Sequence, residues 1–236
     1  MRGLARLFAV LFVLVVGALA LGLAIPGPQR VLVPEGFGLT EIAPRVWTDA
    51  PDRAEALLAL ARGAQDRVAA AFGGDPPRPT LVLCSTEPCA RDFGVGGNGL
   101  ALGPFAVLVA PGGLTAGTLT HEMTHARLHR GMGLRTLVRQ PYPTWFDEGL
   151  ATYVADHPVW RGPITAEDRA RVRQVTRFWQ LDEAFDDLGV GRTYRAAAAE
   201  VAAIADAGGP EGLGEVIRRA GAGEDFGAVV AEVTGR

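Results

Sequence analysis

Three residues within the stretch LTHEMTHARLHRG, residues 119–131, have the types and the spacing of a metal site. His121 and His125 are four positions apart, and Glu122 lies between them. Residues at positions i and i+4 lie one turn apart on the same face of a helix, so both imidazoles could reach one zinc ion. Glu122 would point about 100° away from His121, beside the ion, where its carboxylate could accept a proton from water. The same pattern also arises by chance, so the interpretation needs a third ligand.

A catalytic zinc site has three protein ligands and one open position. His129 follows at the same interval, but it lies about 12 Å from His121 along an unbroken helix. Three side chains spaced in this way cannot meet one ion. We therefore expect His129 to interact with the carbonyl groups at the end of the helix.

Glu148, in the stretch WFDEGLATY, is the better third ligand. Between His125 and Glu148 lie 22 residues, enough for the first helix to end, a loop to cross and a second helix to pack against it. A carboxylate among apolar neighbours is costly to desolvate unless it is paired or bound to metal. The alternative is a solvated glutamate that interacts favourably with the dipole at the N-terminus of its helix.

Two neighbours of Glu148 are expected to support the site. Asp147 is the competing ligand, but adjacent side chains on a helix point about 100° apart, so only one of the two carboxylates can face the histidines. We favour Glu148 as the ligand and expect Asp147 to fix a ligand imidazole by a hydrogen bond. Thr152, one turn after Glu148, could do the same.

The stretches HEMTH and WFDEGLATY together resemble the gluzincin branch of the zinc metallopeptidases, within the peptidase MA-like superfamily. More narrowly, the chain resembles uncharacterised bacterial members of that superfamily. The resemblance covers roughly residues 45–200 in the order of the elements, but only the two stretches are specific. It implies that His121, His125 and Glu148 bind Zn²⁺ and that Glu122 is the catalytic base.

The resemblance also implies an oxyanion-stabilising residue and a substrate-binding strand. Many gluzincins use a tyrosine or histidine from a later helix, and Tyr194 is the natural match, with Tyr153 and His157 behind it. A structural role for Tyr194 is an equal alternative. In that family, a strand ahead of the motif helix lies at a sheet edge and pairs with extended peptide. The run FAVLVA, residues 105–110, occupies that position.

Most predicted strands lie in the first half of the chain and most predicted helices in the second half, which predicts an α+β fold. By the resemblance, the architecture is zincin-like, with a small mixed β-sheet packed on the HEMTH helix and a mainly helical C-terminal part. Apolar periodicity predicts a helix over residues 51–72, and bounded apolar runs predict strands at 44–49, 78–85 and 104–110. The glycine-rich residues 94–103 are expected to form a turn between strands.

Helix-start signals mark three later helices. Thr115 or Thr118 can cap the helix that carries the histidines, and a second helix begins near residue 141. Thr165 begins a third helix, with Asp168 placed for a capping box. Glycine-containing breaks divide the remainder into further helices.

The first 30 residues are set apart from residues 31–236, which we expect to form one zincin-like domain with a mixed α/β part at about 45–131 and a helical part at about 140–236. Two arginines precede an uncharged run at residues 7–25, a pattern typical of an export signal. The run suits either a cleaved signal peptide or an N-terminal membrane anchor. Both alternatives place the rest of the chain outside the cytoplasm, in the periplasm or secreted.

The two cysteines predict a disulfide, and the net charge argues against one class of partner. Cys84 and Cys89 are the two cysteines, and in an exported protein we expect a disulfide that closes this small loop. A metal site at these two cysteines would need a second pair of ligands nearby. The formal net charge of -3 gives no basic field, so we expect no nucleic-acid partner.

By the resemblance, we expect a zinc metallopeptidase that hydrolyses peptide bonds of peptides or proteins outside the cytoplasm. Glu122 would be the general base for a zinc-activated water. Two alternatives remain open: a catalytically inactive, membrane-tethered zincin-fold scaffold, and a zinc amidase that acts on cell-envelope peptides. The intact ligands and base argue against the scaffold, because a decayed site would tolerate the loss of Glu122.

Overall fold

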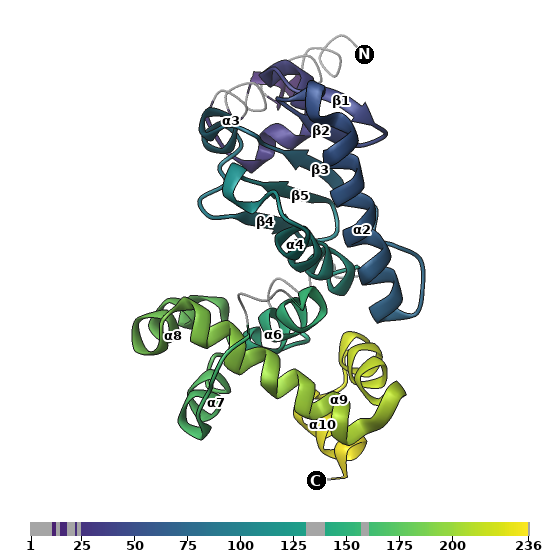
Figure 1. Cartoon of the computed structure of the whole chain (residues 1–236), viewed down its shortest axis with the longest axis vertical. Helices are drawn as coiled ribbons and strands as arrows, with labels where there is room; N and C mark the ends of the chain where they lie inside the picture. Colours follow the sequence, from purple (N-terminus) through teal and green to yellow (C-terminus); the bar gives the residue numbers. More distant parts are fainter. Residues whose placement is uncertain are drawn as a thin grey trace.

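The chain forms two parts that are stacked along its long axis. A computed structural model describes residues 11–12, 15–17, 22, 25–130, 140–156 and 161–235. In Figure 1, the part drawn in blue and teal carries a five-stranded sheet, and the part drawn in green and yellow below it is helical. The fold is therefore α+β, with a small mixed sheet and a mainly helical remainder, which confirms the coarse class predicted from the sequence.

The sheet has the strand order β1-β2-β3-β5-β4. Its strands are β1 (Thr40–Ala43), β2 (Val46–Thr48), β3 (Thr80–Leu83), β4 (Gly99–Leu102) and β5 (Ala106–Val109). β2, β3 and β5 run parallel, whereas the edge strands β1 and β4 pair antiparallel with their neighbours. β2, β3 and β5 lie within the three runs predicted as strands, and β1 has no counterpart in the sequence prediction.

Helices cover both faces of the sheet. Side chains alternate between the faces along each strand. Leu81 of β3 packs on the face covered by α2 (Ala54–Phe72) and α4 (Ala116–Leu128), whereas Val82 packs on the face covered by α3 (Glu87–Asp92). Burial on both faces explains why the central strands read as continuous apolar runs.

The helix predicted over residues 51–72 is confirmed. A 3-10 turn at Pro51–Arg53 leads into α2. The buried face of α2 consists of Leu57, Ala61, Ala64 and Val68. Gly73 ends the helix in the left-handed conformation, with φ of 60°, which glycine adopts without steric cost.

The prediction of a turn over residues 94–103 is wrong in part, because β4 occupies Gly99–Leu102. The prediction that residues 105–110 lie at the sheet edge is also wrong. β5 pairs with β3 on one side and with β4 on the other, where Leu100 is opposite Leu108. The edge nearest α4 is therefore β4. Its glycine-rich surroundings, which weaken strands, concealed it in the sequence.

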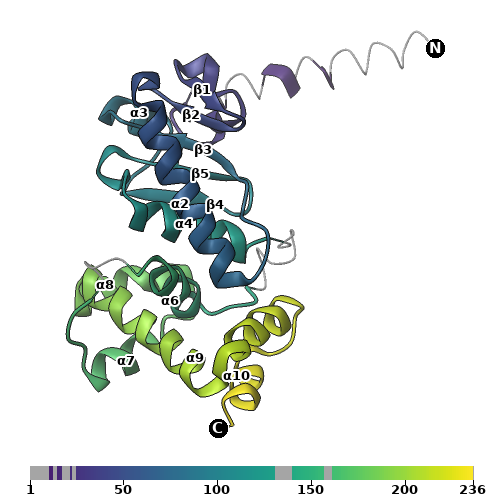
Figure 2. The same cartoon turned by 45° about the vertical axis from the view of Figure 1, so that its right-hand side comes forward.

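The helical part is built around α9. Its helices are α6 (Thr144–Ala155), α7 (Ala166–Val172), α8 (Leu181–Leu188), α9 (Val190–Gly221) and α10 (Phe226–Thr234). Figure 2 shows α9 running beneath α6. Gly149 permits this approach, since a Cβ atom there would lie 2.5 Å from the Ala197 carbonyl oxygen. α9 bends at Gly209, and the capping box expected at Thr165 and Asp168 is present.

The N-terminal prediction falls mostly outside the described residues, which include only parts of the run at residues 7–25. Within the described part of the chain, no helix is both long enough and apolar enough to span a bilayer. Cys84, which follows β3, and Cys89 in α3 form a disulfide. This bond ties the end of a central strand to the helix that covers one face of the sheet.

Candidate metal centre

α4 presents His121 and His125 on one face. Thr115 caps the helix, because its hydroxyl accepts a hydrogen bond from the Thr118 N–H at 3.2 Å. Met123 is buried in the core beneath the sheet, which turns the two imidazoles toward α6. Both histidines are nearly buried, with 7% and 8% of their surface exposed.

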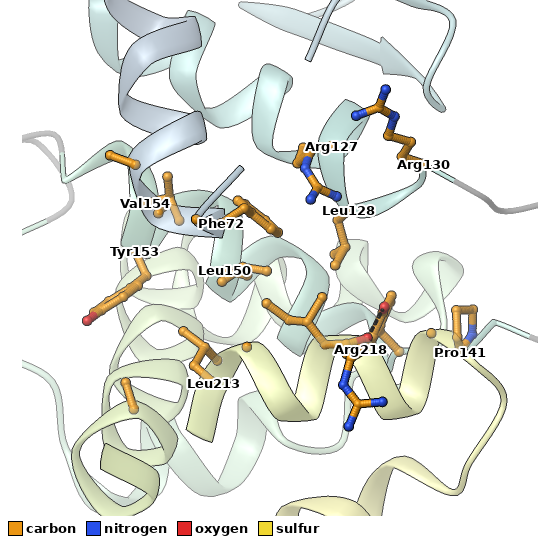
Figure 3. A pocket seen from close by; sticks show the side chains of 18 of the residues that line it. Phe72, Arg127, Leu128, Arg130, Pro141, Leu150, Tyr153, Val154, Leu213 and Arg218 are labelled. Atoms are coloured by element: carbon orange, nitrogen blue, oxygen red, sulfur yellow. Dashed lines mark hydrogen bonds between the residues drawn. The ribbon is translucent and has the colours of Figure 1, made fainter. Parts of the chain in front are cut away.

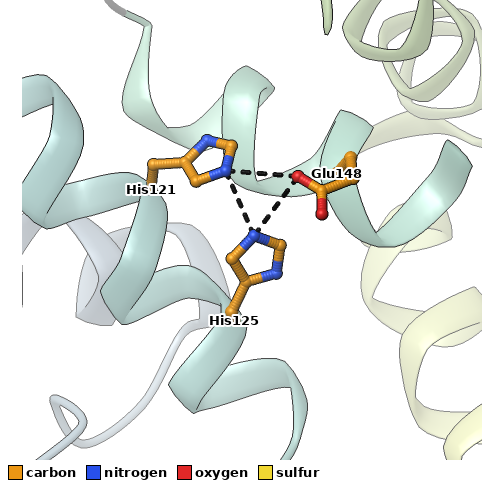
Figure 4. A group of neighbouring side chains, drawn as sticks. All are labelled: His121, His125 and Glu148. Carbon is orange, nitrogen blue, oxygen red and sulfur yellow. Dashed lines mark hydrogen bonds and ion pairs between the residues drawn. The ribbon is translucent and has the colours of Figure 1, made fainter. Parts of the chain in front are cut away.

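Glu148 approaches the two imidazoles from α6. Figure 4 shows its carboxylate pointing between the rings. Glu148 Oε2 lies 3.3 Å from His121 Nε2 and 3.5 Å from His125 Nε2, and the two Nε2 atoms are 3.1 Å apart. Phe146 in the core and Gly149 against α9 fix the start of α6, so that Glu148 takes this direction.

The three donor atoms have the separations that a tetrahedral zinc site requires. Ligand atoms at about 2.0–2.1 Å from one ion stand about 3.3–3.4 Å apart. The separations between the donor atoms of His121, His125 and Glu148 are 3.1, 3.3 and 3.5 Å. Two imidazoles and one carboxylate are also a ligand set of catalytic zinc sites. The two buried imidazoles and the partly buried Glu148 carboxylate can therefore hold a metal ion.

Opposite charges stabilise one another in this group. Burial alone would raise the pKa of Glu148, but the charge of His125 and hydrogen bonds with both imidazoles hold it at about 2. Burial alone would lower the pKa of His125, but the Glu148 and Asp147 carboxylates raise it well above its usual value. The metal-free group therefore favours the protonated form of His125, and a metal ion, which binds the neutral imidazole, would compete with that proton.

Asp147 joins a ligand histidine to His129. Asp147 Oδ1 lies 2.8 Å from His125 Nδ1, and Oδ2 lies 2.6 Å from His129 Nε2. The first contact is the one expected of Asp147, and it leaves His125 Nε2 facing Glu148. The prediction that His129 interacts with the helix-end carbonyls is wrong, because its ring binds Asp147 instead. Burial would raise the pKa of Asp147, but the two histidines lower it well below its usual range.

His125, His129 and Asp147 form a second group whose donor atoms lie within 4.8 Å of one another. Its contacts of 2.8 and 2.6 Å have the length of hydrogen bonds, whereas ligands of one zinc ion stand about 3.3 Å apart. We therefore assign this group to the support of His125 rather than to a second ion.

Glu122 lies beside the ligand group and against the edge strand β4. A hydrogen bond with the backbone of Ala101 ties its carboxylate to that strand. A Cβ atom at Gly99 would lie 2.6 Å from Glu122 Cγ, so only glycine leaves room for this side chain. Burial raises the pKa of Glu122, against the charges of His121 and His125. The shift moves the carboxylate toward the range in which a general base can accept and return a proton.

Tyr194, the residue expected to stabilise an oxyanion, lies next to the ligands. Its ring centroid is 5.7 Å from that of His121 in an edge-to-face contact, and Phe185 packs against it at 5.6 Å. Burial, and then the charges of Glu148 and Glu122, raise the pKa of the phenol above its usual value. Tyr194 therefore keeps its proton and can donate a hydrogen bond.

Three other residues that the sequence analysis associated with the site are not shown to contact the ligand group. Tyr153 is exposed and lines a cavity elsewhere, so the structure does not bring it to the ligands. His157 lies outside the described residues. Thr152 is buried in α6, but its hydroxyl has no hydrogen-bond partner within the described chain, so it fixes neither imidazole there.

Gly99 and Ala101 are the site residues that sequence reasoning missed. They belong to β4, which the sequence prediction treated as a turn. The available signal was the alternation of Leu100 and Leu102 with smaller residues, a period of two that is typical of a strand.

No protein-family model, curated protein or solved structure matches this chain. The resemblance to the gluzincins therefore rests on the two stretches HEMTH and WFDEGLATY. The convergence of their side chains is a property of this chain's own geometry.

Proposed function

We propose that the protein is a zinc metallopeptidase with a zincin-like fold and a gluzincin-type site. The observation that carries the proposal is the convergence of donor atoms from His121, His125 and Glu148 beside a second glutamate, Glu122, whose pKa is raised. Side chains of these types, brought together from two helices, meet the ligand and base requirements of metal-assisted hydrolysis.

The roles of the residues follow from their positions. Bound zinc would supply Lewis acidity, which polarises a carbonyl group and makes water more acidic. Glu122 accepts a proton from the attacking water and later donates it to the leaving nitrogen of the peptide bond. Its hydrogen bond with Ala101 keeps the carboxylate between the ligand group and β4. Tyr194 donates a hydrogen bond to the oxyanion that forms on the scissile carbonyl.

The outer edge of β4 supports a peptide as the substrate. β4 is a terminal strand of the sheet, its residues are half-buried, and its backbone reaches Glu122 through Ala101. An extended chain can pair with an open strand edge through main-chain hydrogen bonds, largely independent of its side chains. A peptide bound in this way would pass directly beside Glu122 and the ligand group.

We further propose that the peptidase acts outside the cytoplasm. The uncharged run at residues 7–25, preceded by arginines, would direct export and would then be cleaved or serve as a membrane anchor. The disulfide between Cys84 and Cys89 fits an oxidising compartment. The substrates would then be peptides or proteins of the periplasm or the medium.

Hydrolysis of an unstructured, labelled protein by the zinc-loaded full chain tests the proposal. Glu122→Gln preserves the size of the side chain but removes its ability to accept a proton. We expect the rate to fall by about 10²–10⁴-fold while zinc is retained. Glu55→Gln, at an exposed position in α2, is the matched control and should leave the rate unchanged. Full activity of Glu122→Gln would contradict the assigned base.

The same assay separates the two alternative functions. Cleavage of cell-envelope peptides without cleavage of the unstructured protein would favour the zinc amidase. Zinc bound to the three ligands without hydrolysis of either substrate would favour the inactive scaffold.

A further inference from the structure

A cavity of about 1030 Å³ is lined by residues of α4 and α6, together with residues of α2 and α9 (Figure 3). α4 contributes Arg127 to its wall, Arg130 lies just after the end of α4, and α6 contributes Leu150 and Val154. On a helix with 3.6 residues per turn, Arg127 points about 160° away from His125. The described residues that line this space, called here the arginine cavity, include none of the donor residues of the metal centre.

The wall of the arginine cavity carries apolar side chains beside its charged groups. It is built from the C-terminal end of α2 and from α4, α6 and α9. Its larger apolar members are Phe72, Leu128, Leu150, Leu213 and Ile217. Its volume is just above the range of about 300–1,000 Å³ found for small-molecule sites. A wall of this kind suits an alkyl chain.

Arg127 brings a charge without a counter-charge into this space. Its guanidinium carbon lies 5.0 Å from the centroid of the Phe72 ring, and its buried Nε has no hydrogen-bond partner among the described residues. Within the same part of the chain, no carboxylate lies within ion-pair distance of Arg127 or Arg130. Burial, and then the charge of Arg130, lower the pKa of Arg127. The two cations therefore repel each other at the cavity wall.

The other charged residues of the cavity do not neutralise this pair. Arg218, across the cavity on α9, is paired with Glu215 at 2.6 Å. Asp206 also lines the wall but forms no ion pair with Arg127 or Arg130 in the described chain. A half-buried guanidinium without a counter-charge is costly, and a bound anion would remove that cost. Arginine recognises carboxylate and phosphate groups through paired N–H donors.

We propose that the arginine cavity binds an amphiphilic anion, with a carboxylate or phosphate head against Arg127 and Arg130 and an alkyl chain against Phe72, Leu150 and Ile217. This site is independent of the metal centre and of peptidase activity. The competing explanation is that both arginines interact with the dipole at the C-terminal end of α4, which needs no ligand.

Titration calorimetry on the zinc-loaded full chain distinguishes the two explanations. The probes are dodecanoate, dodecyl phosphate, dodecanol and inorganic phosphate, the amphiphiles being kept below their micelle-forming concentrations. We expect the two amphiphilic anions to bind saturably, one per chain, and dodecanol to bind at least about tenfold more weakly. Inorganic phosphate should show no saturable binding at the concentrations at which the amphiphilic anions saturate the site. The amphiphile that binds more tightly, dodecanoate or dodecyl phosphate, identifies the preferred head group. Equal affinities for dodecanoate and dodecanol would overturn the proposal.

Three variants locate the site. Arg127→Gln should weaken dodecanoate binding by about tenfold or more, and Arg130→Gln by a smaller factor. Arg62→Gln, at an exposed position of α2, is the control and should have no effect. Arg130 is exposed, so its variant keeps the test valid if Arg127→Gln does not fold. Unchanged affinity in both folded cavity variants, or in Arg130→Gln alone where Arg127→Gln does not fold, would overturn the proposal.

Discussion

On one side of the helix pair α4 and α6, the carboxylates of Asp147 and Glu148 lie within 3.5 Å of imidazole nitrogens. On the other side of the same pair, Arg127 and Arg130 have no carboxylate partner among the described residues. Both sides are partly buried and both carry like-charged neighbours. Within the described residues, the charges of the ligand group are balanced, whereas those of Arg127 and Arg130 are not.

The difference separates two ways of holding charge in a protein interior. At the candidate metal centre, each carboxylate contacts two imidazoles, so the side chains fix one another without an ion. Such preorganisation is what precise metal sites require. In the arginine cavity, the balancing charge must come from outside the described chain. We therefore expect substitutions to be costly on the first side and mild on the second.

Among variants that leave the three ligands and Glu122 unchanged, the largest effect on turnover is expected at Gly99, which binds neither metal nor substrate side chains. Gly99→Val would place a side chain where Glu122 now packs, and a displacement of a catalytic group by about 1 Å can cost about 10²-fold in rate. Zinc binding should persist, because the three ligands are untouched. Gly97→Val is the control, since no atom lies within 4 Å of a Cβ atom there. Steady-state hydrolysis rates of both variants test this, and equal rates would contradict the packing of Glu122 on Gly99.

The next effect concerns the support of His125. Asp147→Asn should lower zinc affinity by about 10–100-fold, because the imidazole loses the carboxylate that orients it. His129→Gln should cost less, since His129 acts on His125 only through Asp147. Competition with a chelator measures the affinities, with the exposed Asp182→Asn as control. If the double variant loses the sum of the two single effects, His129 and Asp147 do not act as one unit.

The pH dependence of zinc binding tests the charge balance of the metal centre. The raised pKa of His125 stabilises the metal-free fold below about pH 6.5, and this contribution is lost as pH rises through the raised value. Zinc needs the neutral imidazole, so its affinity should increase with pH. Glu148, with a pKa of about 2, is already ionised, so it releases no proton when zinc binds. Calorimetry in buffers of different ionisation enthalpy should show that zinc binding releases protons. Release of no proton would contradict this balance.

The smallest effect is expected in the arginine cavity. Without ligand, Arg127→Gln should change the free energy of unfolding by less than about 0.5 kcal/mol, because the lost contact with Phe72 is offset by relief of repulsion from Arg130. Chemical denaturation of the ligand-free chain measures this. A large destabilisation would show that Arg127 has a structural partner, and the contrast between the two sides would fail.

The ligand group was predictable because most of its geometry is local. The spacing of His121 and His125 on one helix fixes their common face, and the desolvation cost of Glu148 points to a partner. Asp147 follows from the same helical angle, because it must point away from Glu148. These inferences require only that two helices form and pack, which apolar periodicity indicates.

The remaining features depend on contacts between distant segments. His129 binds Asp147 only because α4 and α6 approach closely, and no spacing within one helix encodes that distance. β4 was hidden because Gly99 was read as part of a turn, although its lack of a side chain is what admits Glu122. The arginine cavity combines residues from four helices, so no local sequence pattern around Arg127 predicts it.

The most direct test of the metal centre is the zinc content of the purified, dialysed full chain, measured by mass spectrometry. We expect about one zinc per chain in the parent and in Glu122→Gln, and loss of zinc in His121→Ala and in Glu148→Ala. A parent chain without zinc, even after zinc is added, would contradict the account. Retention of a full equivalent in both ligand variants would contradict it as well.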